Sequence, residues 1–335
     1  MLAKVDSLRL AYHIPELAYT VVSEDSVFDL HVIGVQRAGT DFKAQPDDRF
    51  RIGSNTKAVT GLLAAQLVKK GVLSWNTGLF DLFPELKSLA KGRYGKPTLL
   101  DLLSFRTPFI PYTYTYEVPH EGDFKGDERE QRYHFIQWIL KQKPICKKEV
   151  CFSNPDYVAA ALMMEKASRK TYEQLVQQLN DSLQIDFGFG APNVTDTMQP
   201  WGHTDNYIPE APKQNQKLNW LQAAGNLNIS LPQYVKFMQE QLRGLRGHSK
   251  LLSQKEFEFL HFGLPSFSVG WFNAVDSTGE RFTYNYGNPG SFLSKACVFE
   301  KKNRAMVILC NIQTTEAETG LNAIYNLLYS NYCSN

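Results

Sequence analysis

Ser54 and Lys57 are the residues of this chain whose types and spacing most favour covalent chemistry. They stand in the run FRIGSNTK at residues 50–57, where a strand-like sequence gives way to an apolar one. Residues three apart on a helix share a face, so the hydroxyl and the amine can be neighbours. A lysine whose pKa is lowered by burial can take the proton of a serine, and a helix N-terminus offers N–H groups to an oxyanion. The pair predicts a serine nucleophile with a lysine base; a capping serine beside a solvated lysine is the alternative.

The elements that must position this pair are predicted from hydrophobic periodicity. Apolar spacing predicts helices over 56–70, 128–142, 155–167, 172–180, 232–243 and 316–329, the fifth with Ser230 as a plausible N-cap. The first 50 residues are interpreted as strands, with segments over 18–23 and 28–32, and further strands are predicted over 269–275, 281–286, 292–299 and 305–312. Strands at both ends around a helical middle predict an α/β (α+β) protein. Its antiparallel sheet is flanked by helices and carries a mostly helical inserted domain.

This pattern also predicts how the chain divides. Residues 1–54 and 254–335 would form the sheet domain, and residues 55–253 the mostly helical domain, with an active-site cleft between them. Since the FRIGSNTK run lies where the first segment meets the second, Ser54 is expected at that cleft.

Composition excludes several classes of protein. The 335 residues are 43% hydrophobic and 21% charged, which is typical of a folded globular chain. With 36 basic and 34 acidic residues the net charge is +2, which gives no electrostatic reason to expect nucleic acid as a partner. No apolar stretch approaches the about 18 residues that a membrane-spanning helix needs. The compartment stays open: periplasmic or secreted if a signal was removed before Met1, cytoplasmic if Met1 is the native start.

Five cysteines are too few for a disulfide scaffold. Cys146 and Cys151 would be bridged in a tight hairpin, or would be ordinary thiols in a reducing compartment. No histidine or cysteine spacing typical of a zinc site occurs, so neither a metal nor another cofactor is expected.

Residues 51–73 resemble the S-x-x-K block of the serine β-lactamase and penicillin-binding-protein superfamily. The similarity is greatest to its class C β-lactamase-like branch, which includes D-aminopeptidases, DD-peptidases and esterases, and it extends over almost the whole chain. Residues 99–104 are similar to the T-x-x-D-L-L-x-H block of that branch, but Phe105 replaces its histidine. The resemblance implies a β-lactamase/transpeptidase-like fold and catalysis through an acyl-enzyme.

The second motif of the branch, Y-x-N, matches Phe152-Ser153-Asn154. The resemblance implies that Asn154 positions the lysine or the substrate amide. The family's tyrosine shuttles protons, whereas Phe152 can neither donate nor accept one. A tyrosine from the run PYTYTY at residues 111–116 could enter the pocket and supply the missing hydroxyl; ordinary packing of Tyr112, Tyr114 and Tyr116 is the alternative.

The third motif of the branch is best matched by Asn285-Tyr286-Gly287, followed by Asn288. Gly287 permits close approach of the backbone. Asn285 stands where a cationic or titratable residue is usual. In this register the N–H groups of Asn288 and Ser54 would form the oxyanion hole, although neighbouring tyrosines allow alignments shifted by one residue.

Together these residues predict a serine hydrolase that acts through an acyl-enzyme on an amide, ester or β-lactam, with a small-molecule or peptide-like acyl substrate as its partner. Ser54 and Lys57 would be catalytic, and Asn154, Phe152, Asn285, Gly287 and Asn288 would support catalysis or bind substrate. The alternative, favoured by Phe152 and Asn285, is a catalytically impaired member of the same fold that acts as a binding or scaffolding protein. The oligomeric state stays open.

Overall fold

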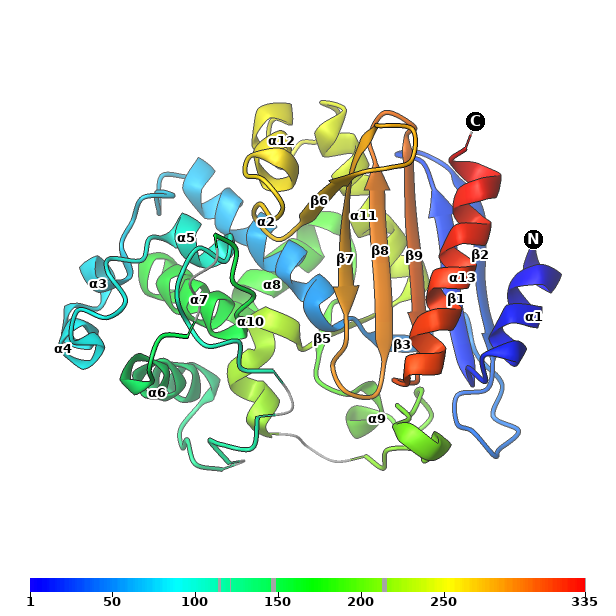
Figure 1. Cartoon of the computed structure of the whole chain (residues 1–335), viewed down its shortest axis with the longest axis horizontal. Helices are drawn as coiled ribbons and strands as arrows, with labels where there is room; N and C mark the ends of the chain where they lie inside the picture. Colours follow the sequence, from blue (N-terminus) through cyan, green and yellow to red (C-terminus); the bar gives the residue numbers. More distant parts are fainter. Residues whose placement is uncertain (114–115, 121, 146–148, 213–215, 335) are drawn as a thin grey trace.

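An antiparallel six-stranded sheet with helices on both faces organises the protein (Figure 1). The computed structural model describes residues 1–113, 116–120, 122–145, 149–212 and 216–334. The strand order is β2-β1-β9-β8-β7-β6, and a separate small sheet has the order β3-β5-β4. The strands are β1 (Glu16–Val22), β2 (Val27–Gly34), β3 (Arg49–Arg51), β4 (Gly188–Phe189), β5 (Leu227–Ser230), β6 (Phe272–Val275), β7 (Arg281–Gly287), β8 (Leu293–Phe299) and β9 (Arg304–Cys310).

The helices of twelve or more residues agree closely with the helices predicted from hydrophobic spacing. The helices of five or more residues are α1 (Leu2–Ala11), α2 (Thr56–Lys69), α5 (Leu99–Leu103), α6 (Glu128–Lys141), α7 (Asn154–Ser168), α8 (Tyr172–Leu183), α11 (Leu231–Leu245), α12 (Gln254–Phe262) and α13 (Thr315–Tyr332). Of these, α1 and α12 are not among the helices predicted from hydrophobic spacing. Short helices are α3 (Leu79–Leu82), α4 (Lys87–Ala90), α9 (Pro192–Thr195) and α10 (Gln222–Gly225), with 3₁₀ turns at Gly53–Asn55, Pro84–Leu86, Asp205–Tyr207 and Gln216–Leu221. Ser230 precedes α11 as its N-cap, but its side chain makes no capping hydrogen bond.

The two faces of the large sheet are covered by different helices. On one face Ala18, Ala296 and Val307 belong to the main core with α2, α7 and α11. On the other face Tyr19 and Ile308 pack against α1 and α13. In Figure 1, α13 lies in front of the sheet and α11 behind it, α1 lies beside β2, and α3 to α7 and α10 lie beyond the β6–β7 edge. The predicted antiparallel sheet flanked by helices is confirmed.

The interpretation of the first 50 residues as strands is wrong for residues 2–11, which form α1. Val5 and Leu8 of this helix, and Tyr12 directly after it, pack on the α13 side of the sheet. No side chain caps its start at Met1, so the usual sequence signal for a helix N-terminus is absent. Tertiary packing therefore accounts for this helix.

The strand predicted over 269–275 is shorter than expected, because β6 begins at Phe272. Gly270 has φ +86, and a Cβ there would lie 2.6 Å from the Lys57 carbonyl oxygen. The backbone therefore presses against α2 at this point instead of continuing a strand.

The division of the chain into two domains stays a prediction. The large sheet takes its strands from residues 16–34 and 272–310. The middle of the chain also holds β4 and β5, and β5 pairs with β3 of the N-terminal part. This pairing ties the strand before Ser54 to the segment that follows α10.

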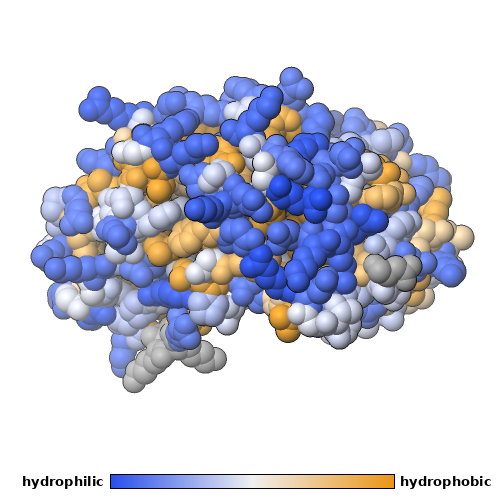
Figure 2. All heavy atoms as spheres, turned by 90° about the horizontal axis from the view of Figure 1, so that it is seen from above, coloured by the Kyte–Doolittle hydropathy of each residue, from blue (hydrophilic) through white to orange (hydrophobic). Residues whose placement is uncertain are grey.

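The visible surface agrees with a hydrophilic exterior. In the face seen from above, hydrophilic residues cover most of the molecule and hydrophobic ones are scattered (Figure 2). Among the described residues, no helix has the length and apolar character needed to cross a membrane.

Candidate active site

Ser54 and Lys57 are in direct contact at the start of α2. Ser54 lies in the 3₁₀ turn Gly53–Asn55, and Lys57 is in the first turn of the helix. The Lys57 Nζ is 2.9 Å from the Ser54 Oγ. Nearly all of α2 is buried, and Lys57 is only 1% exposed, whereas Ser54 reaches the surface of a cavity. The i, i+3 spacing thus places the amine beside the hydroxyl, with the hydroxyl on the open side.

The surroundings of Lys57 favour its neutral form. Burial lowers its pKa from 10.5 to about 7, and the nearby Asp156 opposes this shift only in part. Asp156 is itself fully buried, and burial raises the pKa of its carboxyl well above the ordinary value, which favours a protonated, neutral neighbour. A large share of Lys57 is therefore unprotonated near neutral pH, as a base requires.

Three groups surround the Lys57 Nζ: the Ser54 Oγ, the Asn154 Oδ1 at 2.8 Å and the Ala224 carbonyl oxygen at 2.6 Å. A neutral amine has two N–H donors and one lone pair. Because the amide and carbonyl oxygens only accept, they take the two donors, and the lone pair is left for the Ser54 hydroxyl. The contacts suit a lysine that withdraws the proton from Ser54.

Asn154 is oriented by the loop before it. It is the first residue of α7, and Ser153 caps that helix by accepting from the Asp156 N–H. The Asn154 Nδ2 donates to the Tyr112 carbonyl at 2.9 Å, so the Oδ1 must be the atom that faces Lys57. The Asn154 backbone N–H donates to the Pro111 carbonyl, which fixes the same loop.

Close backbone packing brings the end of β7 next to Ser54. Gly53 has φ +50, and a Cβ there would lie 2.7 Å from the Asn288 backbone nitrogen. A Cβ at Gly287 would lie 2.1 Å from the Ile52 carbonyl oxygen. Both positions therefore require glycine, and both bring Asn288 to the turn that carries Ser54.

A cavity of about 400 Å³ opens over Ser54. Side chains of aromatic and aliphatic residues form much of its wall, together with the small groups around the nucleophile. The described residues that line it are Gly53, Ser54, Thr113, Phe152, Asn154, Leu221, Ala224, Gly225, Phe272, Tyr284, Tyr286, Asn288 and Pro289. None of these thirteen carries a formal charge, which suits an uncharged substrate group.

Phe152 lines the cavity and also contacts Lys57. Its ring centre is 4.9 Å from the Lys57 Nζ, and it is 37% exposed. On its other side it packs against Phe105, with ring centres 5.1 Å apart, and Phe105 stacks on Phe267 at 4.3 Å. Two of the three positions that depart from the family motifs, Phe105 and Phe152, are therefore neighbours, and both are aromatic.

Asn285 is not among the residues that line the cavity. It is 1% exposed, and its Nδ2 donates to the Gly270 carbonyl at 2.7 Å. Since side chains alternate along a strand, Tyr284 and Tyr286 lie on the opposite face of β7 from Asn285. Both tyrosines line the cavity, as does Asn288, while Gly287 serves backbone packing.

The tyrosine run before α6 does not place Tyr112 or Tyr116 in the cavity. Tyr112 is fully buried and packs against Phe135, with ring centres 4.7 Å apart. Tyr116 packs against Tyr112. Tyr114 lies outside the described residues, so a role for that hydroxyl stays a prediction. Cys146 also lies outside them, and its pairing with Cys151 stays a prediction too.

His203 has a structural role, although a histidine in a protein of this kind could be catalytic. Its Nε2 accepts from the Ala38 N–H, its Nδ1 lies 2.7 Å from the Asn311 carbonyl, and it does not line the cavity. The lining residues that were not predicted as site residues are Gly53, Thr113, Leu221, Ala224, Gly225, Phe272, Tyr284, Tyr286 and Pro289. Two of them adjoin predicted residues: Gly53 precedes Ser54, and Pro289 follows Asn288.

Comparisons with known proteins extend over the whole fold. The family model described as Beta-lactamase matches residues 3–330. Protein flp of Staphylococcus aureus (strain NCTC 8325 / PS 47) is 24% identical over 310 residues, which is 90% of this chain and 60% of that protein. The chain thus spans about 60% of the length of this curated relative.

Solved structures share the architecture. A class C beta lactamase from Rhodobacter sphaeroides matches with a TM-score of 0.76 at 16% identity, covering 98% of both chains. FmtA from Staphylococcus aureus matches with a TM-score of 0.77 at 18% identity, covering 98% of this chain and 89% of that one. At these identities the matches show the fold, and the predicted β-lactamase/transpeptidase-like fold is confirmed.

Proposed function

Because this chain belongs to the beta-lactamase family, we propose that it is a serine hydrolase that acts through an acyl-enzyme on Ser54. The observation that carries the proposal is the contact of the Ser54 Oγ with a buried Lys57, whose pKa lies at about 7. A serine needs such a base before its oxygen can attack.

The reaction follows from these positions. The Ser54 Oγ bonds to the carbonyl carbon of the substrate while its proton passes to the Lys57 Nζ. The tetrahedral oxygen lies between the N–H groups of Ser54 and Asn288, and its collapse breaks the bond to the leaving group, which takes the proton from Lys57. Water then attacks the ester on Ser54 with Lys57 again as base, which releases the acid and restores the hydroxyl.

The cavity supports a neutral, largely apolar acyl group as substrate. Phe152, Leu221 and Phe272 offer apolar surface, while no charged side chain lies among the described lining residues. A carboxylate on the substrate would lose its hydration without gaining a cationic partner from these residues. Esters or amides with uncharged acyl groups therefore fit best.

Hydrolysis of a neutral activated ester, p-nitrophenyl butyrate, tests this function. The parent protein should release p-nitrophenol with saturation, whereas Ser54→Ala should fall to the rate of the buffer. Ser74→Ala, at an exposed serine far along the chain from the site, is the matched control and should retain the parent rate. Equal rates for the Ser54→Ala variant and the parent would refute the proposal.

A binding role without turnover is the second candidate, and Phe152 favours it. Its ring lies beside Lys57 where the family motif has a tyrosine, and Phe105 packs beneath it. Restoring the hydroxyl by Phe152→Tyr separates the two functions. Parent turnover that already exceeds that of Ser54→Ala excludes the binding role, whereas turnover that appears only in Phe152→Tyr supports it.

A further inference from the structure

A second cavity, of about 370 Å³, lies next to the Ser54 cavity. The segment 221–226 forms a wall of both: Leu221, Ala224 and Gly225 face the Ser54 cavity, and Gln222 and Asn226 face the second one. We call this second space the Arg51 cavity, since Arg51 lines it. Its size suits an amino acid or a short peptide.

Arg51 is a buried charged group of this cavity with few partners. It ends β3 and is 4% exposed. Within the described part of the chain, its guanidinium has one long hydrogen bond, 3.4 Å from an Nη to the Asn226 Oδ1, and its Nε has no acceptor. No described carboxylate lies within 4.0 Å of it.

Arg49, two residues earlier in the same strand, shows the contrast. It binds the Asp186 carboxylate at 2.9 Å and the Asn228 Oδ1 at 2.6 Å. Burial lowers the pKa of Arg51 to about 10, which leaves it protonated at neutral pH. A buried guanidinium with so few partners is strongly stabilised by an anion that reaches it.

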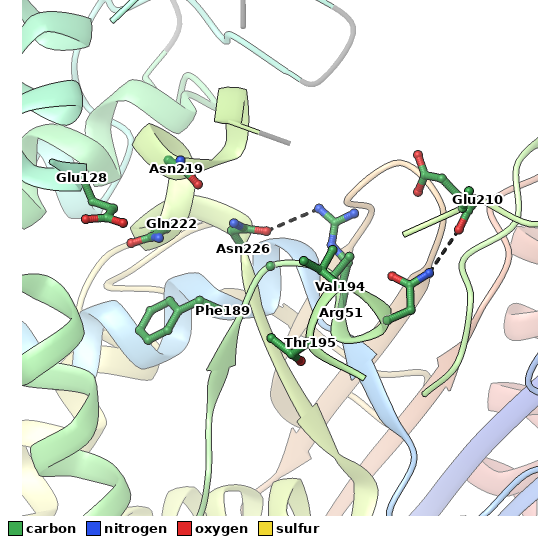
Figure 3. Close-up of a pocket in the computed structure, with 13 residues that line it drawn as sticks. Arg51, Glu128, Phe189, Val194, Thr195, Glu210, Asn219, Gln222 and Asn226 are labelled. Carbon is green, nitrogen blue, oxygen red and sulfur yellow. Dashed lines mark hydrogen bonds between the residues drawn. The ribbon is translucent and has the colours of Figure 1, made fainter. Parts of the chain in front are cut away.

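The other walls of the Arg51 cavity present polar groups (Figure 3). Glu128 lies at the end away from Arg51, with Gln222 between them and Phe189 beneath. The Glu210 carboxylate also lines this cavity and its charge favours the protonated Arg51, but it forms no ion pair with Arg51, and its Oε2 accepts from the Ser291 Oγ at 2.7 Å. A carboxylate ligand thus meets a cation at one end, and an amino group meets an acid at the other.

We propose that the Arg51 cavity is a binding site for the carboxylate of an amino acid or short peptide. The carboxylate pairs with the Arg51 guanidinium, and the amino end lies toward Glu128 and Gln222. This site is distinct from the Ser54 cavity and does not depend on turnover at Ser54. Free amino acids and peptide C-termini share this chemistry, and their sizes distinguish them.

Calorimetric titration tests the site with three probes: alanine, the dipeptide Ala-Ala and alaninamide. Titrations use the Ser54→Ala variant as well as the parent, so that hydrolysis cannot contribute heat. Alanine or Ala-Ala should bind both proteins alike, and alaninamide, which lacks the carboxylate, should bind at least ~10-fold more weakly. If Ala-Ala binds more tightly than alanine, the ligand is the C-terminal end of a peptide. If alanine binds more tightly than Ala-Ala, the ligand is a free amino acid.

Variants locate the binding. Arg51→Gln should weaken it at least ~10-fold, while Arg49→Gln, its matched control on the same strand, should leave it unchanged. Val194→Trp, at a 42% exposed position on the wall, fills the cavity without touching the core and should also abolish binding. Absence of binding by the parent at millimolar probe, full binding by Val194→Trp, or loss of binding in Ser54→Ala would each overturn the proposal.

Discussion

Replacing Asn154 by aspartate should move the pH dependence of hydrolysis to higher pH. The parent's kcat/KM should rise with pH around the Lys57 pKa of about 7, because only the neutral amine can take the Ser54 proton. In Asn154→Asp a carboxylate would stand where the Oδ1 now lies 2.8 Å from the Nζ. An anion at this distance stabilises the ammonium form.

The size of the shift follows from this distance. An opposite charge within about 4–6 Å raises the pKa of a lysine by ~1–3 units, which moves the midpoint to ~8–10. At pH 7 the neutral fraction would then fall from about one half to between ~10% and ~0.1%, a rate loss of ~5-fold to ~500-fold. At the upper end of the pH range most of this loss should disappear.

The assay is a pH series of kcat/KM with p-nitrophenyl butyrate for three proteins. Asn154→Ala is the control, because it removes the same hydrogen bond without adding a charge, and its midpoint should stay at about 7 or fall below it. A midpoint in Asn154→Asp equal to that of the parent, or a parent profile without a titration near 7, would refute the role of Lys57 as base.

Three further predictions concern stability. The folded pKa of Lys57 lies below its unfolded value, so its buried charge opposes folding below about pH 7 by ~5 kcal/mol. This cost fades as the pH rises toward 10.5. The Lys57→Met variant should therefore have a higher melting temperature than the parent at pH 6, and the difference should shrink by pH 9. Burial and the neighbouring Asp48 raise the folded pKa of Glu16, so the contribution of Glu16 to stability is present at low pH and is lost as pH rises above 4.5. In urea titrations the unfolding free energy of Glu16→Gln should therefore rise relative to that of the parent between pH 5 and pH 8. A difference in unfolding free energy that stays constant over this range would contradict this. Gly53→Ala adds a Cβ 2.7 Å from the Asn288 nitrogen at φ +50, and should lower both the unfolding free energy, by at least ~1–2 kcal/mol, and the hydrolysis rate, whereas an unchanged melting temperature would argue against close packing there.

Much of the secondary structure follows from local pattern. The run after Ser54 is apolar on every side, and it forms a buried helix from Thr56 to Lys69, within one residue of the prediction. The long helices of the middle segment are also found within a few residues of their predicted bounds, because their apolar spacing matches the helical period. By contrast, α1 has no cap, and only its packing against the α13 side reveals it.

The candidate site is less accessible to such reasoning. The i, i+3 spacing of Ser54 and Lys57 is local, so their contact could be anticipated. The orientation of Asn285 could not, because it depends on which face of β7 meets Gly270, a residue from another segment. Likewise Tyr112 turns into the core against Phe135, a partner that no local pattern indicates.

The Arg51 cavity is another feature that could not be predicted from local sequence pattern. The sequence displays Arg49 and Arg51 as similar residues two positions apart. Only the tertiary structure pairs Arg49 with Asp186 and leaves Arg51 buried with one long hydrogen bond. Burial and the absence of a described carboxylate partner set the two arginines apart, and both are consequences of packing between distant segments.

The most direct test of the central claim is the mass of the protein during turnover. The parent is mixed with p-nitrophenyl butyrate, quenched with acid within the first turnover, digested, and examined by mass spectrometry. We predict a transient gain of one butyryl group on the peptide that contains Ser54, which decays as the ester is consumed and is absent from Ser54→Ala. Hydrolysis with no acyl group on that peptide, or with the same group retained in Ser54→Ala, would contradict an acyl-enzyme on Ser54.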